Sequence, residues 1–202
     1  QLLKPFTYRQ RATIVNYPQV IETLNLKQTS KSESTCLLIA CLKNNLEIVR
    51  YLIDNCGANI DQLTCSQDFE DWDSLTFFIN RSKRYNELLV PNFNYTASVL
   101  WHSCRSSEFK IIKFLVQRNA NVNSTTETLY NSTPLMVACC KSRLEEVKFL
   151  LKDGKANINQ LDINGENCLF YAVKCNTNCI NIIELLIQKG VEINRTCLLY
   201  TS

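Results

Sequence analysis

Hydrophobic residues recur at helical spacing in several segments of the chain, and polar or glycine-containing breaks separate them. In the clearest segment, Leu144, Val147 and Leu150 follow one another every three residues, which places them on one face of a helix. Just before it stands a shorter apolar stretch that Thr133 can cap and whose first turn Pro134 fits. The pattern predicts two helices joined by a short turn, and the chain is therefore expected to be all-α.

This helix-turn-helix unit occurs four times, at residues 34–61, 97–123, 132–159 and 166–194. Equivalent leucines are 63, 35 and 34 residues apart, and they are Leu37, Leu100, Leu135 and Leu169. An Asn or Asp closes each unit, at Asp61, Asn123, Asn159 and Asn194. A period near ~33 residues resembles that of the ankyrin repeat, which implies a solenoid of stacked helix pairs.

Breaks after the second helices use residue types that tolerate a left-handed backbone. Gly57, Gly154 and Gly190 stand at this point in three units, and Asn119 stands there in the other. Because glycine serves to end the units, the chain shows no phosphate-binding glycine loop.

The spacing of 63 between the first two leucines is nearly two periods. Either a decayed repeat lies there or residues 62–96 are an insertion, and we favour the insertion because they carry no repeat signature. Residues 1–33 include YPQVIETLNL, which is typical of the outer helix of a degenerate N-terminal capping repeat.

Composition narrows the classes of function. The net charge of +3 is spread along the chain, which gives no indication of nucleic-acid binding. The longest apolar runs are far too short to cross a membrane, and no signal peptide is visible. The chain has one histidine and no nucleophile–base motif, so we expect neither an enzyme nor a cofactor.

Eleven cysteines are a high and odd number. Cys36, Cys41, Cys139 and Cys168 fall within apolar helical patterns, where a thiol acts as a small hydrophobe. We therefore expect reduced thiols in a cytoplasmic or nuclear protein rather than a disulfide framework. Zinc is the alternative for Cys175 and Cys179, four residues apart, although ligands of the usual spacing are missing and we expect no metal site.

One stretch resembles a particular group of ankyrin proteins. The segment NANVNSTTETLYNSTPLMVAC at 119–139 and the segment SVLWHSC at 98–104 resemble the Fem-one family, which also has a long insertion in this place. The resemblance runs from about residue 34 to 194. It implies a substrate receptor of a cullin-RING ubiquitin ligase, whose ankyrin region captures C-terminal tails of substrates, often ending in arginine. It also implies that a further C-terminal region binds the adaptor and the cullin. A general ankyrin scaffold that binds another folded protein is the alternative.

The resemblance implies where a tail would bind. An acid from the insertion should pair with the tail, and Asp68, Asp71 and Asp73 lie there. Trp101 and Ser132 complete the predicted peptide-binding residues. Trp101 could equally pack between repeats, and Ser132 lies beside a helix cap. The neighbouring His102 is expected to be an exposed polar residue.

Two positions depart from the family pattern. Lys141 stands where the family has an acidic residue, and Met136 stands where it has arginine. A lysine there would repel an arginine tail, so the preferred terminal residue is expected to differ.

The two ends of the chain are expected to be cuts. The first residue is Gln1 rather than methionine. Residues 197–202, CLLYTS, are what the end of a transposase sequencing adaptor encodes, and we expect them to be a read-through of library DNA.

Overall fold

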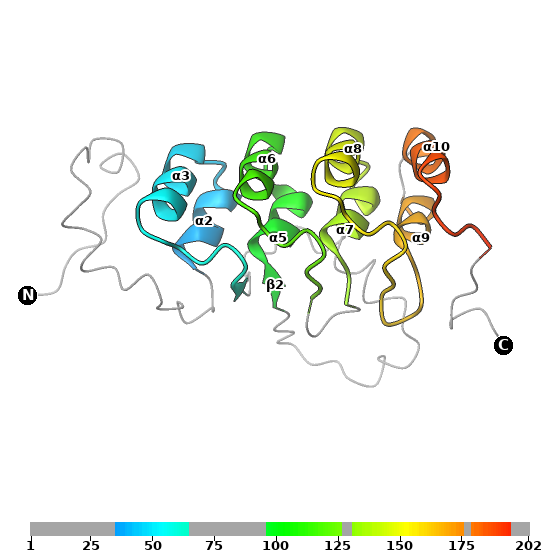
Figure 1. The fold of residues 1–202 in the computed structure, drawn as a ribbon, viewed down its shortest axis with the longest axis horizontal. Helices are drawn as coiled ribbons and strands as arrows, with labels where there is room; N and C mark the ends of the chain where they lie inside the picture. Colours follow the sequence, from blue (N-terminus) through cyan, green and yellow to red (C-terminus); the bar gives the residue numbers. More distant parts are fainter. Residues whose placement is uncertain (1–34, 65–95, 127–130, 176–178, 195–202) are drawn as a thin grey trace, which may run out of the picture.

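The computed structural model describes residues 35–64, 96–126, 131–175 and 179–194. Four helix pairs stand side by side in chain order, as predicted, and make a mostly helical ankyrin stack (Figure 1). The first helices of the pairs form one layer and the second helices the other. The pairs are α2 (Cys36–Leu42) with α3 (Leu46–Asp54), α5 (Val99–Ser106) with α6 (Phe109–Gln117), α7 (Pro134–Cys140) with α8 (Leu144–Lys152), and α9 (Cys168–Val173) with α10 (Ile180–Gln188).

Each first helix begins at a polar residue in the same place of its unit. The predicted cap is confirmed in the third unit, where Met136 N donates to Thr133 Oγ1 at 3.3 Å and Pro134 occupies the first turn. Such a bond satisfies a backbone N–H that has no partner inside the helix. The other units use the same device, with the side chains of Thr35, Ser98 and Asn167 as acceptors.

One continuous core runs through the stack. The four equivalent leucines, Leu37, Leu100, Leu135 and Leu169, are all buried in it, as their spacing predicts. Successive first helices pack against one another more closely than successive second helices do. Helices α2 and α5 are in direct contact, so the stack continues across the long segment that separates them in sequence.

The turns after the second helices follow the expected pattern with one difference. Asn119 has a φ of 63°, and Gly57 and Gly190 also adopt the left-handed conformation. Gly154 does not, and Lys155 takes the left-handed place with a φ of 53°. Glycine is needed at 154 for another reason: a Cβ there would lie 2.9 Å from the carbonyl oxygen of Leu150.

The Asn or Asp that closes each of the first three units binds the backbone of the next unit. Asp61 Oδ1 accepts from Asn121 N at 2.8 Å, and Asn123 Oδ1 accepts from Asn157 N at 2.8 Å. The third step repeats this contact between Asn159 and the amide of Glu192, at 2.9 Å. The regular spacing of these residues thus reflects a ladder of hydrogen bonds along one edge of the stack.

Candidate protein-binding face

Two short strands hold the ends of the segment between the first and second units. Strand β1 (Leu63–Thr64) pairs antiparallel with β2 (Ala97–Ser98), with Leu63 opposite Ser98 and Thr64 opposite Ala97. β2 leads directly into α5 (Figure 1). The residues that flank the intervening segment therefore lie side by side, next to the N-terminus of α5.

His102 ties α5 to this strand pair. Its Nε2 lies 3.1 Å from the carbonyl oxygen of Thr64, and since a carbonyl can only accept, Nε2 carries the proton. The expectation of an exposed side chain is wrong, because the imidazole is buried where it bonds Thr64 of β1. Burial lowers the pKa of His102 to about 4, the bond to Thr64 opposes this shift, and the charge of Arg105 adds to it. The ring is therefore neutral near pH 7.

The structure brings Trp101 and Ser132 together. Trp101 Nε1 donates to Ser132 Oγ at 3.1 Å, which joins the second unit to the start of the third. Only 5% of Trp101 and 2% of Ser132 is exposed. Ser132 is held in turn by Thr126, whose hydroxyl accepts from Ser132 N at 3.2 Å and whose N–H donates to Ser132 O at 3.2 Å. Both residues thus serve packing between units, and contact with a peptide stays a prediction.

The other predicted peptide-binding residues are the three acids of the insertion. Asp68, Asp71 and Asp73 lie outside the described residues, on the segment whose ends β1 and β2 hold. Of the two positions that depart from the family pattern, Met136 is fully buried and Lys141 is half-buried at the end of α7.

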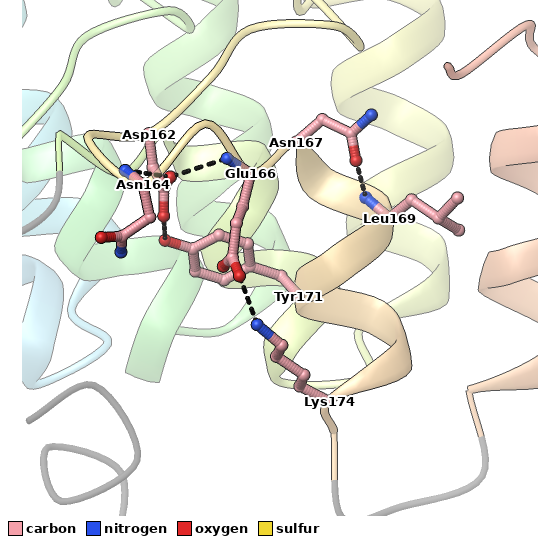
Figure 2. A network of polar contacts seen from close by, with 7 residues as sticks. All are labelled: Asp162, Asn164, Glu166, Asn167, Leu169, Tyr171 and Lys174. Carbon is pink, nitrogen blue, oxygen red and sulfur yellow. Dashed lines mark hydrogen bonds and ion pairs between the residues drawn. The ribbon is translucent and has the colours of Figure 1, made fainter. Parts of the chain in front are cut away.

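A second polar group lies at the entrance to the last unit (Figure 2). Asp162 Oδ1 accepts from the amides of Asn164 and Glu166 at 2.8 and 2.9 Å, which closes the turn. Tyr171 of α9 donates its hydroxyl to Asp162 Oδ2 at 2.9 Å, and Lys174 pairs with the buried carboxylate of Glu166. Both acids are buried, and a buried charge requires such partners. The network fixes the turn before α9 rigidly on its helix.

Sequence reasoning missed most of these polar contacts. Thr126 and His102 each bond a group on another segment, so no local pattern marks them. A signal did exist for Asp162: the order Asp-x-Asn-Gly at 162–165 is typical of a tight turn closed by the first side chain.

Comparison with known proteins agrees with this architecture. The family model for ankyrin repeats in three copies matches residues 10–126 and 100–197. The chain belongs to the ankyrin-repeat family. Ankyrin repeats are protein-binding modules and are typically not catalytic, so this chain is a protein-binding module.

Three relatives show how far the similarity extends. A fem-1 homolog of Drosophila melanogaster is 32% identical over 124 residues, which cover 61% of this chain and 15% of that protein. Fem-1 homolog A of Rattus norvegicus is 29% identical over 161 residues, which cover 80% of this chain and 21% of that protein. An ankyrin repeat protein of Acanthamoeba polyphaga mimivirus is 28% identical over 94 residues, which cover 44% of this chain and 19% of that protein. The chain is thus distantly similar to fem-1 homologs and spans about a fifth of the length of its relatives.

Two further features are absent from the described part of the chain. None of its helices is long and apolar enough to cross a membrane. Nor do its residues include a group of three or more His, Cys, Asp or Glu side chains placed to hold a metal ion.

Proposed function

We propose that this chain is the substrate-recognition region of a cullin-RING ubiquitin ligase receptor and that it binds the C-terminal tails of substrates. The similarity to fem-1 homologs over 80% of the chain carries the proposal. A region beyond those residues would bind the adaptor and the cullin, so the ankyrin region alone holds a substrate without delivering it.

The anchoring of both flanks of residues 65–95, which include Asp68, Asp71 and Asp73 and are called the acidic segment below, supports this assignment. The β1–β2 pair fixes both of its ends beside α5, and the bond from Trp101 to Ser132 holds α5 against the start of α7. In this proposal Asp68, Asp71 and Asp73 pair with the tail. Trp101 and Ser132 would keep the junction of the second and third units in place.

The charge of Lys141, at the end of the first helix of the third unit, affects which tail is bound. Lys141 ends α7 with a positive charge where the family has an acid. A positive charge repels a terminal arginine but attracts a free carboxylate. We therefore propose that the α-carboxylate of the tail, more than an arginine side chain, is what this chain recognises.

Binding of a peptide panel tests the proposal. The peptides differ in their final residue, and each is made with a free and with an amidated C-terminus. A receptor for C-terminal tails binds the free acid and loses binding on amidation, as isothermal titration would measure. A folded-protein scaffold, the alternative function, shows no such difference, and equal binding of acid and amide would rule the proposal out.

A charge variant locates the site. Asp68→Asn, Asp71→Asn and Asp73→Asn together are expected to weaken binding of a basic tail at least ten-fold. The matched control changes three exposed acids on second helices: Glu47→Gln, Glu145→Gln and Glu184→Gln. It removes the same charge from the chain and should leave affinity unchanged. If both variants weaken binding equally, the effect comes from net charge and not from the acidic segment.

A further inference from the structure

Two thiols of the last unit meet at one hydroxyl. Ser142 Oγ lies 3.0 Å from Cys175 Sγ and 2.9 Å from Cys179 Sγ. Because both sulfur atoms contact the same oxygen, the distance between them is at most the sum of these two distances. Ser142 lies in the turn between α7 and α8, Cys175 directly follows Lys174, the C-cap of α9, and Cys179 directly precedes α10. The cluster thus joins the helix–helix turns of the third and fourth units.

The hydrogen atoms of this cluster can be assigned in one consistent order. Cys175 Sγ donates to the carbonyl oxygen of Cys140 at 3.0 Å, which uses its proton. The Ser142 hydroxyl, with a single proton, can then donate to Cys175 and accept from Cys179. In this order, hydrogen bonds run from the Cys179 thiol to the Ser142 hydroxyl and from that hydroxyl to the Cys175 sulfur.

This pair differs from the core thiols of the stack. Cys41 and Cys104 are completely buried, and burial raises the pKa of each to about 12, so they persist as unreactive thiols. Cys175 is only half-buried, while Cys179 is buried. An accessible thiol with a second one nearby is the arrangement that peroxide-sensitive pairs use.

We propose that Cys175 and Cys179 form a reversible dithiol–disulfide pair that is oxidised by hydrogen peroxide. The Cys175 sulfur attacks one peroxide oxygen, the O–O bond breaks, and the departing hydroxide takes up the thiol proton to leave as water. Cys175 is then a sulfenic acid. The Cys179 sulfur attacks the Cys175 sulfur, the S–O bond breaks, and the hydroxide leaves as a second water with the proton of Cys179. Two thiols lose two electrons and two protons, and one peroxide is reduced to two waters.

Oxidation would alter the contact between the third and fourth units. Ser142 adopts the left-handed backbone with a φ of 56°, which is unfavourable for a residue other than glycine. Its bonds to both sulfurs help to hold it there. A disulfide would draw the sulfurs toward each other and away from the hydroxyl. Ser142 directly follows Lys141, whose charge bears on the proposed tail binding, but the test of the thiol pair does not depend on that proposal.

Peptide mapping tests the pair directly because Lys174 and Lys189 bound one tryptic peptide that contains both cysteines. The folded chain is treated with dilute hydrogen peroxide, alkylated and digested. The peptide 175–189 should become lighter by two hydrogen atoms and carry no alkyl group, and dithiothreitol should reverse both changes. Full alkylation of both cysteines, or a cross-link from Cys175 to the peptide that holds Cys140, would overturn the proposal.

Two variants separate this pair from its neighbour. Cys179→Ser should stop oxidation at a Cys175 sulfenic acid that dimedone traps. The matched control Cys140→Ser keeps the carbonyl that Cys175 contacts and should form the disulfide as the unchanged chain does.

In urea, the unchanged chain should form the disulfide several-fold more slowly than when folded. Equal rates would show that the fold does not position the two sulfurs.

Discussion

The imidazole of His102 links the core of the second unit to the strand pair where the acidic segment begins and ends. It is buried, bonded to Thr64 O, and the only histidine of the chain. Its pKa falls from 6.5 to about 4 on folding. Between these values the unfolded chain binds a proton that the folded chain does not, so the stability that His102 provides is complete above pH 6.5 and is lost as pH falls toward 4.

The free energy of unfolding should therefore decrease by about 2 kcal/mol between pH 7 and pH 5 through this one group. His102→Gln keeps a donor for Thr64 O and removes the titration. Urea denaturation of both proteins at several pH values measures the difference. The free energy of unfolding of the variant should depend on pH less strongly, by that amount. An identical pH dependence in the two proteins would mean that folding does not hold His102 in a buried, neutral state.

At the scale of the helix pair, the last unit exposes an apolar face. In each inner unit, the equivalent face is covered by the unit that follows. Val173 at the end of α9 is 63% exposed. The equivalent residues of the three preceding units, Cys41, Cys104 and Cys139, are 0% exposed because the next unit packs on each of them. Ile180, Ile187 and Ile193 are also exposed, whereas the corresponding side chains of the inner units are at least partly buried.

Such a face favours self-association. Val173→Lys with Ile187→Lys should make the chain sediment as a monomer at concentrations where the unchanged chain associates. The control is Ile163→Lys, which places the same kind of charge on a 60% exposed isoleucine in the turn before α9. Sedimentation velocity distinguishes them. If the control disperses the protein equally, general charge rather than this face governs association.

Sequence periodicity was sufficient for the elements and insufficient for the contacts between them. The buried leucines, the Thr133 cap and the left-handed Asn119 each follow from spacing or residue type within one unit. The burial of His102 and the meeting of Ser142 with two sulfurs depend on segments more than thirty residues apart. A pattern read within one unit gives no information on contacts between residues so far apart in sequence. For the same reason the sequence could suggest Trp101 and Ser132 but not that they bond each other.

For the whole molecule, the decisive feature is that the first unit shares its core with the second despite the long segment between them. Helices α2 and α3 have seven and nine residues, and helices of this length are not stable alone in water. Their stability must come from packing on each other and on the second unit, where α2 contacts α5 and α3 contacts α6. Leu100 of α5 is fully buried in the core that the two units share. The surface on which the proposed function depends exists only if this junction forms.

Hydrogen–deuterium exchange of the α2–α3 amides, measured in the unchanged chain and in Leu100→Ala, tests this junction most directly. Truncation of a buried leucine costs about 2–5 kcal/mol, and in a continuous stack that loss reaches the neighbouring units. We expect α2–α3 to be protected in the unchanged chain and to lose that protection in Leu100→Ala, while Ile187→Ala on the exposed end face leaves it unaltered. Protection of α2–α3 that does not change in Leu100→Ala would contradict the account.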